Sequence, residues 1–397
     1  MSARDLSFER VVAFAADLIR IPSLPGNERD LAARVRRELD HLGFADVRID
    51  ELGNVIGVAP GRGAAPAVML SSHLDMVDVG DPASWEYPPF GGIVDGGFLH
   101  GRGAMDIKGP LALQTYAAAH FLDHPADGDV VVAHTVFEER GGWGMDALVR
   151  SGTLRPGAVI LGEATNGDVC IGHRGRAELI VELQGVAGHA SAPERARNPL
   201  DALPEVIPAL QEFAARLPSA PILGKATLAP TAVETLPRSR NVIPDRARVI
   251  VDWRTIPGLS AEDTRRTLED FLRPRIRLPE GCALDVRFAT EHQRSYTGLE
   301  CERDLFTPGY LLAPDHPVAV AAANAVRAGL GREPALRPWT FATDGGHTCG
   351  EQGIPTVGFA PGEERFAHTN RERLDLDQAR AVYEAYPLVI RAVMGAA

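Results

Sequence analysis

The sequence predicts an α/β protein with a mixed, mainly parallel sheet covered by helices on both faces, and a smaller α+β domain inserted into it. Two observations support this. Short apolar runs alternate with amphipathic segments before residue 175 and after residue 317, as in a sheet with helices on both faces. Between these parts, strands read instead as polar–apolar alternation, which is typical of a sheet with one solvated face.

Composition narrows the class of protein. The 397 residues are 45% hydrophobic and 24% charged, which suits a globular chain of two or three domains. A formal charge of −12 argues against nucleic acid or an anionic membrane as the main partner. We find no apolar run long enough for a membrane span, no signal peptide and no CxxC pair among the four cysteines. We therefore expect a cytoplasmic protein with free thiols.

The first part of the chain begins with two amphipathic helices. One is capped by Ser7 and ends before Pro22, and the other ends at Gly43. The remaining predicted elements are strands at 47–49, 54–58, 67–72, 130–137 and 158–161, and helices at 107–122 and 145–150. The apolar run at 67–72 has no polar alternation, so we expect it to be buried on both faces.

The middle of the chain reads as strand, helix, strand, strand, helix, strand. The strands are predicted at 177–183, 226–234, 246–254 and 283–288, and the helices at 199–217 and from Ser260 onward. This order is that of the ferredoxin-like split unit. We therefore expect three parts, at residues 1–175, 176–291 and 292–397. The last part resumes the first fold with helices at 318–328 and 377–394 and a strand at 356–359.

Acidic and histidine side chains gather where the predicted buried strands end. His73 and Asp75 follow one strand, and the adjacent Glu138 and Glu139 follow another. Two neighbouring carboxylates at a buried position repel each other unless a cation or a shared proton compensates. The other members of the group are Asp106, in a glycine-rich loop, Glu163 after the next strand, and His368 in a late loop.

Histidines and carboxylates at one sheet edge, without cysteine, suit a pair of divalent cations with mixed nitrogen and oxygen ligands. Residues two apart on an extended segment point the same way, so Asp75 can orient His73 from behind. Taken singly, each of these motifs is also compatible with a plain surface pair or a helix cap.

Taken in order, the motifs are His73-x-Asp75, Gly103-Ala-Met-Asp106-x-Lys-Gly, Glu138-Glu139, Gly162-Glu163-Ala-Thr and Ala367-His368-Thr-Asn-Arg-Glu. They resemble the zinc metallopeptidases of the acetylornithine deacetylase, succinyl-diaminopimelate desuccinylase, aminoacylase and glutamate carboxypeptidase type. The resemblance covers nearly the whole chain. It implies a zinc-exopeptidase-like fold with an inserted domain used for closure and dimerisation.

The resemblance also implies roles for individual residues. Asp106 bridges two metal ions, most simply zinc, with cobalt possible. His73 and Glu163 complete one metal site, and Glu139 and His368 complete the other. Glu138 is the general base, and Asp75 orients His73. In the inserted domain, His189 stabilises the oxyanion, and Asn241 and Arg254 bind the carboxylate of the substrate.

Two features depart from the family pattern. The segment Thr343-Asp344-Gly345-Gly346-His347 stands where relatives have a pocket-lining loop with an arginine, so Gly345 and Gly346 are expected at the substrate while His347 has no assigned role. The stretch from Gln293 to Pro314 is longer than a simple return from the inserted domain. Both departures bear on substrate preference rather than on the metal chemistry.

The expected function is hydrolysis of an N-acyl amino acid beside a free carboxylate by a homodimer with two divalent metals. A dipeptidase or a glutamate-type carboxypeptidase is the alternative that shares the same site. A non-catalytic binding protein on this fold is the alternative of another class, but it has no need of a base at Glu138. A metal-dependent phosphatase fits the metal ligands but not the carboxylate-binding residues.

Overall fold

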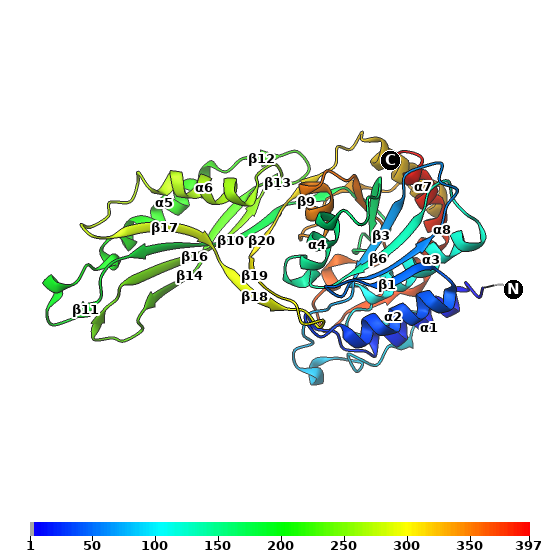
Figure 1. Ribbon diagram of the computed structural model, residues 1–397, viewed down its shortest axis with the longest axis horizontal. Coiled ribbons are helices and arrows are strands. Elements are labelled where there is room, and N and C mark those ends of the chain that lie inside the picture. The colour runs from blue at the N-terminus through cyan, green and yellow to red at the C-terminus, as the bar shows by residue number, and fades with distance from the viewer. Residues whose placement is uncertain (1–3) are drawn as a thin grey trace. The chain divides into compact units, whose positions relative to one another are not determined.

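The computed structural model describes residues 4–397, and the first three residues of the predicted N-terminal part lie outside the described range (Figure 1). The chain divides into two compact units. The core unit comprises the described residues up to His173, Gln293–Cys301 and Leu311–Ala397. The inserted unit comprises Arg174–His292 and Glu302–Tyr310. The inserted unit therefore includes a second segment, 302–310, beyond the single stretch of 176–291 that the sequence suggested.

The core unit is built on an eight-stranded mixed sheet. In spatial order its strands are β1 (Ala45–Ile49), β2 (Val55–Ala59), β6 (Val130–Thr135), β3 (Val68–His73), β7 (Ala158–Leu161), β23 (Thr356–Gly358), β8 (Val169–Cys170) and β22 (Leu336–Arg337). The central strands β6, β3, β7 and β23 run parallel. Every residue of β3, β6 and β7 is buried, as the uninterrupted apolar runs predict.

Six long helices pack around this sheet, namely α1 (Phe8–Ile19), α2 (Arg29–Leu42), α3 (Lys108–Asp123), α4 (Trp143–Ser151), α7 (Pro317–Leu330) and α8 (Leu376–Met394). Their ends follow from the sequence. Gly43 ends α2 in the left-handed conformation, and Gly331 ends α7 in the same way. Helix α3 packs on β3 and β6, and α2 packs on β1 and β2. The fold class expected for this part is confirmed.

A small three-stranded sheet in the core unit joins distant parts of the chain. It consists of β4 (Ile93–Asp95), β5 (Phe98–His100) and β24 (Arg373–Asp375). In its register, Arg373 lies opposite His100. This pairing brings the residues before β24 beside the glycine-rich loop that follows β5.

The inserted unit has the strand order β14-β16-β10-β17, with every neighbouring pair antiparallel. Its elements are β10 (Gly175–Gln184), α5 (Leu203–Arg216), β14 (Thr227–Leu236), β16 (Arg246–Thr255), α6 (Ala261–Leu272) and β17 (Ala283–Phe288). Alternate residues of β16 are buried, so one face of the sheet packs on the helices. The side chain of Ser260 caps α6, with Asp263 N–H donating at 3.1 Å.

The long stretch after β17 has an ordered structure. Strand β18 (Thr290–Arg294) forms a hairpin with β19 (Glu300–Asp304), and the tip of this hairpin belongs to the core unit, where the Tyr296 hydroxyl donates to the Gly53 carbonyl at 2.8 Å. The chain then adds β20 (Phe306–Thr307) to β10 in the inserted unit. The extra length is therefore used by this hairpin and by the added strand.

Among residues 4–397, no helix combines the length and the apolar character that a bilayer crossing requires. The four cysteines, Cys170, Cys282, Cys301 and Cys349, are free thiols.

Candidate metal centre

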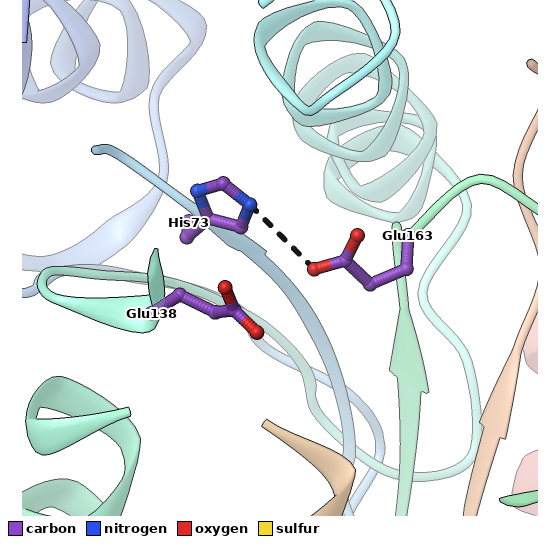
Figure 2. A group of neighbouring side chains, drawn as sticks. All are labelled: His73, Glu138 and Glu163. Atoms are coloured by element: carbon purple, nitrogen blue, oxygen red, sulfur yellow. Dashed lines mark ion pairs between the residues drawn. The ribbon is translucent and has the colours of Figure 1, made fainter. Parts of the chain in front are cut away.

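Three parallel strands of the core sheet bring the predicted polar residues to one edge. Strand β3 ends at His73, β6 leads into the turn Glu138–Arg140, and Glu163 follows β7. Because β6, β3 and β7 are neighbours, their carboxyl ends meet. Figure 2 shows the three side chains pointing toward one another, and one ligand atom from each lies within 4.8 Å of the others. His73 Nε2 is 3.6 Å from Glu163 Oε1.

Asp106 lies between the two histidines. Its Oδ1 is 3.2 Å from His73 Nε2, and its Oδ2 is 3.2 Å from His368 Nε2. His368 Nε2 is also 3.1 Å from Glu139 Oε1. The five residues expected as metal ligands therefore form one cluster, with Glu138 beside it. In this cluster each oxygen of Asp106 faces a different histidine, as a bridging carboxylate requires.

Asp75 has a wider role than the sequence suggested. Its carboxylate accepts the peptide N–H groups of Glu138, at 3.1 Å, and of Glu139, at 3.0 Å. His73 Nδ1 lies closer to the Asp75 carbonyl oxygen, at 3.0 Å, than to Asp75 Oδ1, at 3.5 Å. Asp75 therefore orients the imidazole mainly through its backbone and holds the Glu138–Glu139 turn through its side chain.

Sequence reasoning assigned no role to Glu372, which fixes the loop of Asp106. One carboxylate oxygen accepts the peptide N–H groups of Met105, at 3.2 Å, and Asp106, at 3.1 Å. The other pairs with the buried Arg102 guanidinium at 2.5 Å. On the far side of the loop, the Lys108 ammonium donates to the Ile21 carbonyl at 2.7 Å, and burial lowers the pKa of Lys108 to about 7. Backbone hydrogen bonds of this kind give no pattern in the sequence.

The electrostatics of the cluster favour bound cations. Burial raises the pKa of Glu163 and of Glu138 well above their ordinary values, and neighbouring carboxylate charges raise both further. Hydrogen bonds to Asp106 and Glu139 raise the pKa of His368 to about 10. Four carboxylates crowded around two imidazoles therefore repel one another. The donor set fits divalent ions that take mixed nitrogen and oxygen ligands, and zinc is the common case.

A cavity of about 240 Å³ adjoins the cluster. Besides metal-site residues, its walls are formed by Phe341, Ala342, Glu364 and Ala367. The side chain of Glu364 is fixed by an ion pair with Arg337 and by the Thr340 hydroxyl, which donates to it at 3.0 Å. Sequence analysis did not identify Phe341 or Glu364, because both lie in loops without a motif of their own.

Gly345 and Gly346, which we expected at the substrate, are buried at the start of the π-helical turn Gly346–Glu351. They are not among the residues that line this cavity, whereas Phe341 and Ala342 from the same segment are. Their proposed contact with substrate therefore stays a prediction, and the structure points to their neighbours for that wall.

In the inserted unit, the predicted residues fall into two groups. His189 is exposed on β11 (Gly188–His189), which pairs with β15 (Val242–Ile243), and the Asn241 carbonyl accepts the N–H of Ala190 at 3.1 Å. Arg254 lies on β16 opposite Arg176, whereas Arg246, at the other end of β16, lies opposite Gln184. Eight residues of strand separate Arg254 from Arg246, which is about 26 Å. Within one inserted unit, Arg254 and the His189–Asn241 pair therefore lie at opposite ends of the sheet.

Comparison with known proteins agrees with this geometry. The sequence profile described as peptidase family M20/M25/M40 matches residues 69–392. The chain is 32% identical over 381 residues to the uncharacterized protein YgeY of Escherichia coli K12, covering 94% of this chain and 93% of YgeY. It is 31% identical over 375 residues to a putative [LysW]-lysine/[LysW]-ornithine hydrolase of Pyrobaculum aerophilum, covering 94% and 95%. It is 30% identical over 412 residues to a succinyl-diaminopimelate desuccinylase of Methylorubrum populi, covering 95% and 97%.

Solved structures share the fold. The M20 family metallo-carboxypeptidase Sso-CP2 of Sulfolobus solfataricus matches with a TM-score of 0.73 at 16% identity, over 98% of this chain and 99% of that one. The YXEP protein of Bacillus subtilis, described as a dinuclear metal-binding peptidase of the M20 family, matches with a TM-score of 0.70 at 18% identity, over 98% and 99%.

An α/β sheet with a carboxylate–histidine cluster at its strand ends, interrupted by a ferredoxin-like unit, defines the class of two-unit metallohydrolases. The chain belongs to peptidase family M20/M25/M40. It is a metal-dependent hydrolase that acts on amide or peptide bonds.

Proposed function

We propose that this hydrolase cleaves the amide bond of an N-acyl amino acid next to a free carboxylate, with two divalent ions, most simply zinc, as cofactors. The observation that carries the proposal is the position of Asp106 between His73 and His368, with Glu138 beside the cluster. Relatives named for desuccinylation and for lysine or ornithine release support this substrate class. The free thiols and the composition support a cytoplasmic location.

The proposed ligands follow the two histidines. His73 and Glu163 hold one ion, Glu139 and His368 hold the other, and Asp106 bridges them. When bound, such ions supply Lewis acidity and lower the pKa of a water molecule to about 7. Asp75 keeps the Glu138–Glu139 turn in place through two peptide N–H groups. This contact aims one carboxylate at the metals and leaves the other free for proton transfer.

Glu138 is the proposed general base. It removes a proton from the water that adds to the amide carbon, and it delivers that proton to the nitrogen when the C–N bond breaks. A base that must also return its proton works best with a pKa near the operating pH. Burial and the charge of Glu163 move the pKa of Glu138 upward, in the direction that this double task requires.

Arg254 is proposed to bind the substrate carboxylate. Asp252 holds its guanidinium with two contacts, Nε to Oδ1 at 2.8 Å and Nη2 to Oδ2 at 3.3 Å. These contacts fix the plane of the guanidinium and leave Nη1–H groups for a ligand. A fixed planar fork is the arrangement that recognises a carboxylate by two parallel hydrogen bonds.

Arg254→Ala is expected to raise KM for substrates with a free carboxylate by about 10- to 100-fold, since hydrogen bonds to charged groups contribute about 1.5–3 kcal/mol. The corresponding substrate amides lack the charge and are expected to change little. Steady-state kinetics on matched acid and amide substrates measure the difference. Arg248→Ala is the control, because Arg248 lies on the same strand but pairs with Glu182. An equal loss on acids and amides would contradict carboxylate recognition.

Removal of the metals is expected to abolish activity and to lower the melting temperature. Without cations the clustered carboxylates repel one another, and an ion present at about 100 times its Kd adds about 2.7 kcal/mol to the free energy of unfolding. Scanning calorimetry with chelator, and then with added zinc or cobalt, measures both effects. Glu163→Gln is expected to shrink the stabilisation by metal. A chelated protein with unchanged activity and melting temperature would contradict the metal proposal.

A homodimer is proposed through the inserted unit. Arg254 and the His189–Asn241 pair lie about 26 Å apart along β16, too far for one small substrate to touch both within one unit. A second copy of the chain resolves this distance, because it supplies His189 and Asn241 while the first copy supplies Arg254. The family resemblance implies the same exchange of the histidine between subunits.

Release of free amine from a panel of N-acyl amino acids and a panel of dipeptides tests the proposed function. The proposal predicts higher kcat/KM on N-acyl amino acids than on dipeptides. The opposite order would favour the dipeptidase or carboxypeptidase alternative, which shares the same site. No hydrolysis in either panel with zinc or cobalt present would favour a binding protein on the same fold.

A further inference from the structure

A second group of charged side chains lies on the far side of the turn that carries Glu138 and Glu139. Helix α4 contributes Asp146 and Arg150, and the π-helical turn Gly346–Glu351 contributes His347 and Glu351. Arg150 forms ion pairs with Asp146 and with Glu351, the latter at 3.1 Å. His347 is only 2% exposed. None of these residues takes part in the proposed chemistry.

This group is not another metal site. Asp146, His347 and Glu351 offer ligand atoms within 4.8 Å of one another. However, the Arg150 guanidinium already balances both carboxylates, and both ring nitrogens of His347 have other partners. The group is therefore an ion-pair network, and its innermost member is His347.

The two ring nitrogens of His347 face acceptors. Nε2 is 3.0 Å from the Gly141 carbonyl oxygen, and Nδ1 is 3.1 Å from Glu351 Oε2. A carbonyl oxygen can only accept, so Nε2 carries a proton and donates it to Gly141. Burial disfavours the imidazolium, but the hydrogen bond to Glu351 and the charge of Asp344 outweigh burial and raise the pKa of His347.

The imidazole packs directly on the backbone of the turn. Gly142 has φ = +72°, and a Cβ at this position would come within 2.7 Å of the His347 ring and 2.9 Å of Asp344 Oδ1. Gly142 is therefore needed both for its conformation and for the closeness of the ring. A side chain at Gly142 would displace His347 from the Gly141 carbonyl.

The turn is held from two sides. Asp75 accepts the N–H groups of Glu138 and Glu139 at its start. At its end, Gln293 Nε2 donates to the Arg140 carbonyl at 2.7 Å and His347 donates to the Gly141 carbonyl. Phe137, just before the turn, has φ = +59° although it is not a glycine, and such a conformation persists only where the surroundings fix it.

We propose that His347 and Gln293 are positioning residues that hold the carbonyl side of the turn 138–141 and so fix the direction of the Glu138 carboxylate. The proposal rests on the proposed role of Glu138 as general base. It assigns a function to His347 and to the start of the stretch after Gln293, the two features that departed from the family pattern. A displacement of about 1 Å at a reacting group can cost about 10²-fold in rate.

His347→Leu is expected to lower kcat by about 10- to 100-fold while KM and metal content change less than about 2-fold. His347→Gln keeps a side-chain N–H that can reach the Gly141 carbonyl, and it is expected to restore most of the rate. Thr348→Val is the matched control. Thr348 lies on the same helical turn, and its buried hydroxyl bonds to the Thr356 hydroxyl at 2.7 Å, so this variant loosens the segment without touching the turn. Equal losses of kcat in His347→Leu and Thr348→Val would overturn the proposal.

A double-mutant cycle tests whether His347 acts through Glu138. In the Glu138→Gln background, His347→Leu is expected to cause no further loss of kcat, because the group that it positions is already gone. A loss by the same factor in both backgrounds would overturn the proposal.

Hydrogen exchange gives a readout that does not depend on catalysis. Peptides covering 136–144 are expected to exchange at least about 10-fold faster in His347→Leu than in Thr348→Val, because a tether of this backbone is lost. Unchanged exchange would overturn the positioning role even if the enzyme were active. A wild-type protein that hydrolysed no amide would instead refute the proposed function, and the exchange measurement would still decide the role of His347.

Discussion

Glu138→Gln is expected to lower kcat by about 10²–10⁴, the range usual for loss of a general base. The amide keeps the size of the side chain and leaves the peptide N–H that donates to Asp75 in place. It cannot take a proton from water or return one to the leaving nitrogen. KM and the metal content are therefore expected to stay near their wild-type values. Stopped-assay kinetics together with metal analysis by atomic spectroscopy make the measurement.

Glu139→Gln separates the two neighbouring carboxylates. Glu139 contacts His368 at 3.1 Å, so its loss is expected to lower metal content first and activity as a consequence. Excess zinc is expected to restore part of the activity of Glu139→Gln and none of that of Glu138→Gln. Near-normal turnover in Glu138→Gln, or rescue of that variant by zinc, would reverse the assignment of the pair.

The sequence was most informative where buried strands end. Uninterrupted apolar runs gave β3, β6 and β7, and the polar residues that follow them had to meet because neighbouring parallel strands end at one edge. The same reasoning brought His73, Glu138 and Glu163 together without any knowledge of loop structure. The order of strands and helices in the inserted unit likewise predicted its antiparallel sheet.

Contacts made through the backbone could not be predicted. Asp75 holds peptide groups of the turn, and Glu372 holds those of the Asp106 loop, and neither interaction requires a particular residue type at the partner. Register was also inaccessible. Asn241 and Arg254 looked like two halves of one carboxylate site until β16 placed them at opposite ends of a strand.

Loops that reach the site from later parts of the chain were the hardest to foresee. Phe341 and Glu364 line the cavity because β22 and the segment after β23 bring their loops to the same sheet edge. The hairpin after β17 and the π-helical turn at His347 appeared only as departures from a pattern. Both contact the backbone that carries Glu138, which is a tertiary relationship with no local signal.

His189→Ala is expected to lower kcat by about 10²–10³, the usual cost of removing one oxyanion donor. His189 Nδ1 accepts the backbone N–H of Ser191 at 3.1 Å, so in the neutral imidazole the proton lies on Nε2. That N–H points away from its own loop contact and is available to a developing oxyanion. His189 is exposed in the inserted unit, so a donor role requires a site outside its own unit. KM is expected to change less than kcat, because the oxyanion forms only in the transition state.

Mixing of two inactive variants shows which subunit supplies this donor. A Glu138→Gln chain keeps His189, and a His189→Ala chain keeps Glu138. If the histidine acts on the neighbouring subunit, each heterodimer gains one site with both groups intact, and an equal mixture recovers about a quarter of the wild-type sites. Mixing Glu138→Gln with Glu163→Gln is the control, because both defects lie in the core unit and each site keeps one of them. Heterodimers demonstrated by mass spectrometry without recovered activity would show that His189 acts within its own chain or not at all. Recovery in the first mixture alone would establish that the catalytic site is completed by two copies of the chain.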